Sequence, residues 1–151
     1  PDGVAFLLHE LGNQVSVIVR DGAQWTTRQT IPMLPEGYDQ PNTAAAVRLS
    51  TDGKRLFASN RGHDSIAVYD VAPDYTLALV GIYSSGGGGP RDFILLDDRT
   101  LLIAHQDGDV RLASFDPAKG IQTLDLLSMG GAVCVCPVWR RGAATTGRAD
   151  S

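Results

Sequence analysis

The sequence predicts an all-β protein built from antiparallel hairpins. Short runs rich in β-branched and aromatic residues recur along the chain, and polar turns such as Thr51-Asp52-Gly53-Lys54 separate them. Glycine accepts the positive φ angle that a tight hairpin turn requires, so Asp-Gly between two such runs indicates a hairpin. No segment keeps an apolar residue every three or four positions, which excludes a fold made of helix pairs.

One pattern occurs three times, and its clearest copy runs from Leu49 to Val71. Each copy has a polar turn, a short apolar run, a polar elbow and a second apolar run. Aligning the elbows at Glu10, Arg61 and Gln106 gives repeat lengths of 51 and 45 residues. Repeats of about 40 to 50 residues that carry several short strands are typical of β-propeller blades. The sequence therefore predicts a β-propeller fragment.

The apolar runs predict strands, taken here in chain order. The expected strands are Val4–Leu8, Val15–Arg20, Trp25–Ile31, Ala44–Ser50, Leu56–Ala58, Ile66–Val71, Thr76–Tyr83, Phe93–Leu96, Leu101–Ala104, Val110–Phe115, Ile121–Leu127 and Ala132–Val138. The first copy lacks its inner strand, the second is complete, and the last strand would open a fourth blade. Residues 32–43 are rich in Pro, Gly and Asn and predict a loop.

These strands divide the chain into two parts. Residues 1–138 form about three four-stranded blades of a propeller, whereas residues 139–151 show no alternation and are expected to be a disordered or non-native tail. Closed propellers have about four to eight blades. We therefore expect the missing blades to come from the rest of a longer protein.

Composition and charge narrow the class of protein. The chain of 151 residues is 43% apolar and 20% charged, and its 17 glycines and 8 prolines suit a turn-rich globular fold. A net charge of −4 offers no basic stripe, so nucleic acid is not expected as a partner. No apolar run approaches the roughly 18 residues of a membrane span. We expect a soluble, cytoplasmic protein with no membrane partner.

The two cysteines, Cys134 and Cys136, lie two positions apart on a predicted strand and would point to one face. A disulfide between them would need unusual geometry, and no further Cys or His cluster completes a zinc site. We expect both to be buried thiols of an intracellular protein.

Five sequence blocks carry a resemblance to a known family. They are FLLHELGNQVSV from Phe6, QTIPMLPEGY from Gln29, AAVRLSTDGKRLFASNRGHDSIAVYDV from Ala45, GGPRDFILL from Gly88 and GGAVCV from Gly130. In this order they resemble the bacterial lactonase family of seven-bladed propellers, which includes a 6-phosphogluconolactonase. The SNRGHDSI and PRDF blocks are the more specific ones. The resemblance is to the C-terminal part of such enzymes and leaves about four N-terminal blades unmatched.

The resemblance implies hydrolysis of a sugar-acid lactone, namely 6-phosphogluconolactone to 6-phosphogluconate in the pentose phosphate pathway, without a metal or an organic cofactor. In the related fungal carboxymuconate-lactonizing enzymes a Glu and an Arg of these repeats are implicated, and they correspond to Glu10 and Arg61. A His and a further Arg of those enzymes lie in earlier blades and have no counterpart here. Two alternatives stay open: a carboxymuconate-type cycloisomerase, and a non-catalytic propeller that binds a ligand or a protein.

The elbows themselves also suggest a site. Equivalent places in successive blades converge on the axis of a propeller, so Glu10, Arg61 and Gln106 are expected near one another. Opening a lactone requires an activated water and donors for the oxyanion. We expect Glu10 to act as the base and Arg61 to bind the lactone oxygen or a phosphate. The alternative is a structural ion pair between blades.

Three other residues are expected to line the pocket for the small-molecule lactone, and they are His105, Gln106 and Arg91. Turn or strand-edge hydrogen bonding is the more common role of a histidine, and no metal site is expected. The run Gly86–Gly89 lacks the Gly-Lys-Ser/Thr ending of a phosphate-binding P-loop, so we expect a flexible linker between blades.

Overall fold

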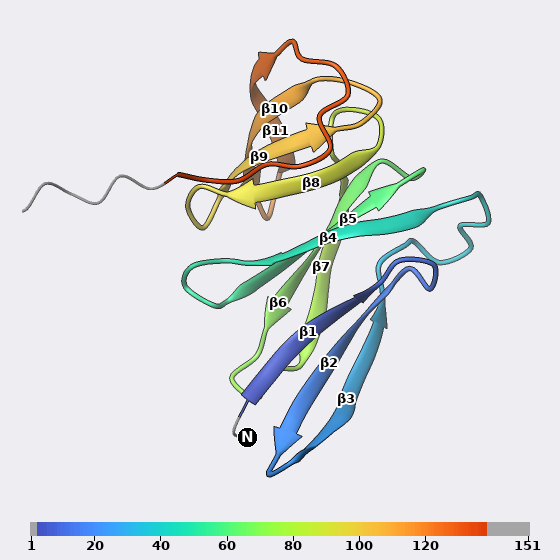
Figure 1. Ribbon diagram of the computed structural model, residues 1–151, viewed down its shortest axis with the longest axis vertical. Helices are drawn as coiled ribbons and strands as arrows, with labels where there is room; N and C mark the ends of the chain where they lie inside the picture. Colours follow the sequence, from blue (N-terminus) through green and yellow to red (C-terminus); the bar gives the residue numbers. More distant parts are fainter. Residues whose placement is uncertain (1–2, 139–151) are drawn as a thin grey trace, which may run out of the picture.

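The computed structural model describes residues 3–138, which form three antiparallel sheets that fan out side by side (Figure 1). The strands, in sheet order, are β1 (Gly3–His9), β2 (Gln14–Asp21) and β3 (Gln24–Pro32); β4 (Thr43–Leu49), β5 (Arg55–Arg61), β6 (Ser65–Val71) and β7 (Leu77–Ser84); and β8 (Pro90–Leu95), β9 (Thr100–His105), β10 (Val110–Asp116) and β11 (Gly120–Leu127). Each sheet is a meander of sequential neighbours. The partial β-propeller is confirmed.

The first sheet contains three strands and begins with β1, which occupies the place of the second strand in the other two sheets. This is the missing inner strand that the repeat alignment predicts. In the complete sheets the inner strands are β4 and β8, and they pack beside each other. The elbows after β1, β5 and β9 are therefore equivalent places in the three blades.

Two hydrophobic cores lie between the sheets. Strand alternation sends Leu56 and Ala58 of β5 into the core shared with the first sheet, and Phe57 into the core shared with the third. On β6, Tyr69 faces the first core and Val68 the second. The second sheet is therefore covered on both faces, which explains its continuous apolar runs.

The second strand of each blade is longer than its apolar run. Ser59 and Asn60, predicted to lie in an elbow, belong to β5 and are fully buried. The Ser59 hydroxyl accepts a hydrogen bond from the Ala46 N–H at 3.0 Å, and Asn60 donates to the Met33 carbonyl at 2.8 Å. Because these polar groups have partners, they are stable inside the sheet.

The predicted strand Ala132–Val138 is wrong, since residues 128–138 contain no strand. A strand needs a neighbour for its backbone bonds, and within the described residues no strand pairs with this segment. The Val135 N–H instead donates to the Asp92 carboxylate at 3.1 Å. Cys134 and Cys136 are free and exposed, so the prediction of buried thiols is also wrong. The predicted tail, 139–151, lies outside the described residues.

Candidate functional site

The three elbow residues meet, as their repeat positions predict. Arg61, the last residue of β5, lies between Glu10, which follows β1, and Gln106, which follows β9. Its Nη2 donates to Glu10 Oε1 at 2.7 Å, and its Nη1 donates to Gln106 Oε1 at 3.5 Å. One guanidinium thereby connects side chains from three successive blades.

Arg61 and Glu10 differ in exposure. The Arg61 side chain is 15% exposed, whereas the Glu10 side chain is 61% exposed. Arg61 Nε is buried and has no hydrogen-bond partner within the described residues. A largely buried cation thus holds an accessible carboxylate at its edge, which is a suitable arrangement for a carboxylate that must reach a bound molecule.

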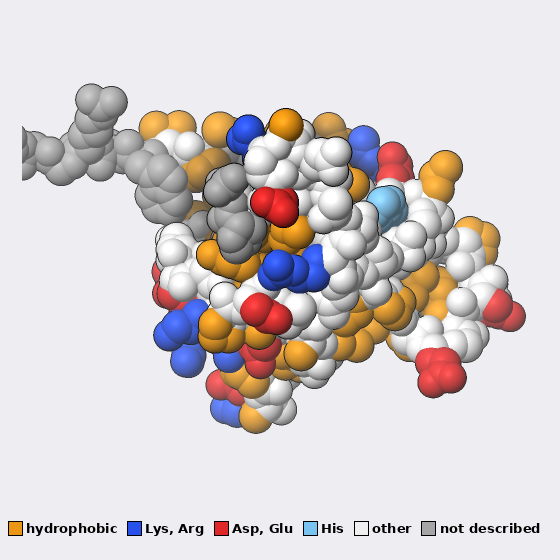
Figure 2. Space-filling model, turned by 90° about the horizontal axis from the view of Figure 1, so that it is seen from below, with side chains coloured by type: hydrophobic (Ala, Val, Ile, Leu, Met, Phe, Trp, Pro, Cys, Tyr) orange, Lys and Arg blue, Asp and Glu red, His pale blue; other side chains and the backbone are white. Residues whose placement is uncertain are grey.

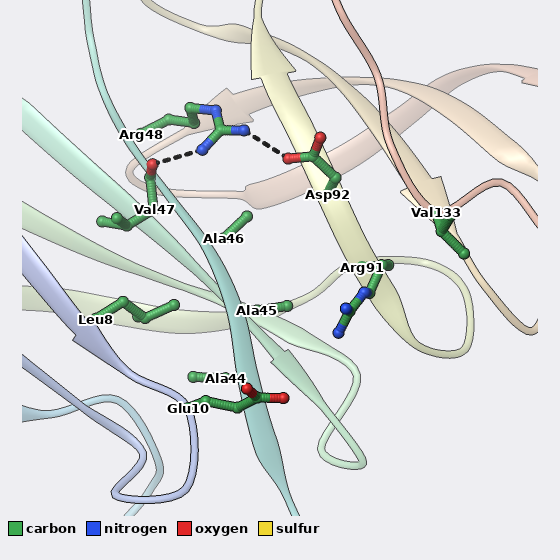
Figure 3. A pocket seen from close by; sticks show the side chains of 10 residues that line it. All are labelled: Leu8, Glu10, Ala44, Ala45, Ala46, Val47, Arg48, Arg91, Asp92 and Val133. Carbon is green, nitrogen blue, oxygen red and sulfur yellow. Dashed lines mark hydrogen bonds and ion pairs between the residues drawn. The ribbon is translucent and has the colours of Figure 1, made fainter.

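A cavity of about 460 Å³ lies beside this cluster and runs along β4 (Figure 3). Leu8 and Glu10 line it on the side of β1, and Arg91 and Asp92 line it on the side of β8. Figure 3 shows the Glu10 carboxylate and the Arg91 guanidinium pointing into the same space from opposite sides. Val133 completes the lining. This volume fits a small molecule.

Arg91 is the cationic residue of this cavity that forms no ion pair within residues 3–138. Arg48 Nη2 donates to Asp92 Oδ1 at 2.6 Å, and Arg61 is paired with Glu10. Arg91 is exposed, and no hydrogen bond or ion pair of its side chain occurs within residues 3–138. Arg91 is therefore the cation of this lining that lacks an ion-pair partner within residues 3–138, and its guanidinium can bind an anionic ligand.

The pair formed by Arg48 and Asp92 escaped the sequence analysis. Asp92 is 8% exposed, and its carboxylate also accepts from the N–H groups of Phe93 and Val135. Asp92 lies in the PRDF block, and this specific block could have marked it as a candidate site residue. Arg48 also lies in a block of the resemblance, the one from Ala45, but only the packing of β4 against β8 brings the two residues together.

His105 lies apart from the cavity-facing groups. Its side chain is fully buried, with Nδ1 2.9 Å from the Asp109 carbonyl and Nε2 3.1 Å from the Ser85 hydroxyl. Burial lowers the pKa of the His105 imidazole, which favours the neutral form. The structure therefore gives this residue the hydrogen-bonding role that is common for histidine. Of the other two residues expected to line the pocket, Arg91 lines the cavity, whereas Gln106 lines a separate pocket together with Arg61.

The glycine run 86–89 is a packed, hydrogen-bonded segment, so the expectation of a flexible linker is wrong. A Cβ on Gly87 would come within 2.9 Å of the His105 ring, and one on Gly89 within 2.5 Å of Gln106. Gly89 has a φ of +62°, which glycine adopts readily. These glycines allow the loop to lie directly against the elbow that carries Gln106.

Metal-binding groups of three or more His, Cys, Asp or Glu side chains are absent from the described part of the chain. Residues 3–138 also contain no helix able to cross a lipid bilayer.

Comparison with known proteins gives a family. A family model described as "Lactonase, 7-bladed beta-propeller" matches residues 2–137. An uncharacterized protein of Staphylococcus saprophyticus is 38% identical over 125 residues, which are 82% of this chain and 36% of that protein. One from Staphylococcus aureus is 42% identical over 117 residues, covering 76% of this chain and 34% of the relative. The chain spans about a third of these curated relatives.

Solved structures agree with this. A protein from Lactobacillus plantarum matches with a TM-score of 0.79 at 33% identity, over 89% of this chain and 41% of that one. A periplasmic gluconolactonase of Pseudomonas aeruginosa gives 0.78 at 31%, over 85% and 38%. A putative 6-phosphogluconolactonase from Bacteroides fragilis gives 0.76 at 28%, over 89% and 38%. By family model, identity and fold, the chain belongs to the lactonase family of seven-bladed β-propellers, and it corresponds to a part of such a propeller.

Proposed function

We propose that these blades contribute the catalytic base and the anion-binding groups of a lactonase that hydrolyses a sugar-acid lactone. The observation that carries the proposal is that Glu10, which lines the 460 Å³ cavity, is bound by Arg61, whose guanidinium also contacts Gln106 of the third blade. Membership in the lactonase family and the likeness to a gluconolactonase support it. The rest of the propeller completes the site.

Glu10 is the proposed base because its carboxylate is accessible and already oriented by Arg61. A water molecule attacks the ring carbonyl carbon and gives its proton to Glu10, while guanidinium N–H groups of Arg61 stabilise the oxyanion. The tetrahedral intermediate then collapses, the ring C–O bond breaks, and Glu10 returns the proton to the leaving oxygen. The open-chain acid results, and the Glu10 carboxylate is regenerated.

Arg91 is the proposed anchor for an anionic substituent, because it is the unpaired cation of the lining within residues 3–138. Gln106 offers an amide N–H to a sugar hydroxyl. Together these groups favour a phosphorylated lactone, for which 6-phosphogluconolactone is the proposed substrate. A cytoplasmic location accompanies this substrate in our proposal. The Pseudomonas aeruginosa relative is described as periplasmic, so the compartment is itself a useful test.

The test of the base is Glu10→Gln in a complete propeller that contains these blades. We expect kcat for gluconolactone hydrolysis to fall by about 10² to 10⁴-fold, since a positioned base contributes this much. Glu36→Gln is the matched control, because Glu36 is exposed and lies outside the residues that line the cavity. Unchanged hydrolysis in Glu10→Gln would refute the assignment.

The test of the substrate is Arg91→Ala in the same propeller, assayed with gluconolactone and with 6-phosphogluconolactone. If Arg91 binds the phosphate, KM rises about tenfold or more for the phosphorylated lactone alone, because a charge-assisted bond is lost. An equal effect on both lactones would show that Arg91 contacts the ring. No effect on either would remove Arg91 from the site.

A further inference from the structure

The residue before each elbow residue makes hydrogen bonds in its blade, and two of these residues hold the preceding loop. Asn60, before Arg61, is fully buried and donates to the Met33 carbonyl of the preceding inter-blade loop. His105, before Gln106, is equally buried and contacts Ser85 of its own preceding loop. An amide in one blade and an imidazole in the next thus occupy the same position.

The contacts of His105 fix its proton. The Asp109 carbonyl can only accept, so Nδ1 carries the hydrogen and donates to it over 2.9 Å. Nε2 lies 3.1 Å from the Ser85 hydroxyl, whose oxygen is also 2.9 Å from the Asp64 and Gly87 carbonyl oxygens that accept from it. The imidazole therefore joins the turn after its own strand to the start of the inter-blade loop.

The inter-blade loop in turn holds the elbow. Gly87 packs against the His105 ring, because a Cβ at this position would come within 2.9 Å of the ring. The Gln106 N–H donates to the Gly89 carbonyl at 2.9 Å, and the Asp107 N–H donates to Gly88 at 3.3 Å. The loop, fixed at Ser85 and Gly87 by His105, thus supplies the acceptors for the backbone on which Gln106 stands.

The far side of the loop is tied to the second blade. The Gly89 N–H donates to Asp64 Oδ1 at 2.8 Å, and the Ser85 N–H donates to the Asp64 carbonyl at 2.9 Å. Asp64 follows Arg61 by three residues in the turn between β5 and β6. Loop 85–89 consequently sets the spacing between the two elbows that Arg61 and Gln106 bridge.

We propose that His105 is a positioning residue. It acts through loop 85–89 to keep the side-chain amide oxygen of Gln106, Oε1, within reach of the Arg61 guanidinium. This deepens the proposed function, because it assigns a role to a residue of the same site that touches no substrate. The proposal does not require turnover, so it can be tested separately from lactone hydrolysis.

The test measures amide hydrogen exchange and the ¹⁵N signals of the Arg61 guanidinium in the 151-residue chain. In His105→Ala we expect the Gln106 and Asp107 amides to exchange about tenfold or more faster relative to the core amide of Ala58, because their loop acceptors are released. The Arg61 signals shift with them. Ser85→Ala keeps the imidazole and removes the hydroxyl that contacts His105 Nε2 and the Asp64 and Gly87 carbonyls, so it tests the loop itself, and both readouts are expected to change in the same direction.

His105→Asn is the rescue variant, since Asn60 at the equivalent position of the second blade binds its preceding loop through a side-chain amide. It is expected to return the Gln106 exchange and the Arg61 signals toward those of the unmodified chain. His9→Asn is the control, because His9 precedes Glu10 in the first blade and bonds to Ser16. The proposal is overturned if all amides change equally in His105→Ala and in Ser85→Ala, or if the Arg61 signals stay unchanged.

Discussion

The second sheet and the two flanking sheets are built from the same repeat but are covered differently. Both faces of the second sheet are packed, and β5 and β6 are buried along most of their length. The first sheet buries Phe6 and Leu8 against its neighbour, whereas Leu7, on the opposite face, is 47% exposed. In the third sheet Leu124 and Leu127 are 59% and 57% exposed. Hydrophobic side chains are also visible at the surface from below (Figure 2).

This difference shows what both the stability of a blade and the candidate site require from neighbouring blades. A blade acquires its stability only when neighbours cover both of its faces, because each sheet carries apolar groups on both. The candidate site follows the same rule, since Arg61 of the well-covered sheet organises partners from the two sheets that are covered on one face. The following four changes test this comparison.

Phe57→Ala is expected to have the largest effect. Phe57 is fully buried between the second and third sheets. Its ring lies edge-on to that of Phe115, with 5.4 Å between the ring centroids. Removing a buried Phe side chain costs about 3 to 5 kcal/mol, because it leaves a cavity and loses contacts. Denaturant unfolding of the chain measures this cost. A loss no larger than that of Leu7→Ala would contradict the two-sided core.

Asp92→Ala tests the link between the second and third sheets at the cavity. It removes the partner of Arg48 and the acceptor for Val135, and we expect a loss of about 1 to 3 kcal/mol, because polar groups lose their bonds. Asp70→Ala is the control. Its side chain is 61% exposed and paired with Arg55, so about 0 to 1 kcal/mol is expected. Equal losses would show that the Arg48 pair is an ordinary surface contact.

A change of pH tests the buried His105. Its pKa is lowered mainly by burial, and the nearby Arg111 of β10 acts in the same direction, whereas Asp64 opposes them. The unfolded chain therefore binds a proton more readily, so stability is complete above about pH 6.5 and falls as the pH drops toward the lowered value. Unfolding at pH 7 and at pH 5.5 measures this. The slope disappears in His105→Asn, and a slope that persists there belongs to another group.

Leu124→Lys is expected to have the smallest effect on stability. The side chain is 59% exposed on the third sheet, and exposed substitutions usually change the free energy of unfolding by less than about 0.5 kcal/mol. Light scattering of the chain is expected to decrease, because an apolar group is removed from an uncovered sheet. A large loss of stability would mean that this face of the sheet is covered within the chain itself.

The sequence predicted the elements and the repeat well because both depend on local pattern. The apolar runs located all eleven strands between Gly3 and Leu127, and Asp-Gly turns separated several of them. The repeat then placed Glu10, Arg61 and Gln106 together, since equal positions in successive blades meet in space. The role of the three in catalysis stays a prediction.

Tertiary structure alone decided which polar groups were buried and which were free. Ser59 and Asn60 resemble loop residues in sequence but lie inside β5, because partners from other strands satisfy them. The strand predicted at Ala132–Val138 failed for the converse reason, since a strand requires a hydrogen-bonding neighbour that sequence alone cannot supply. Local pattern thus determined the blades and their elbows, whereas the contacts between blades determined that Arg91 is unpaired and His105 is buried.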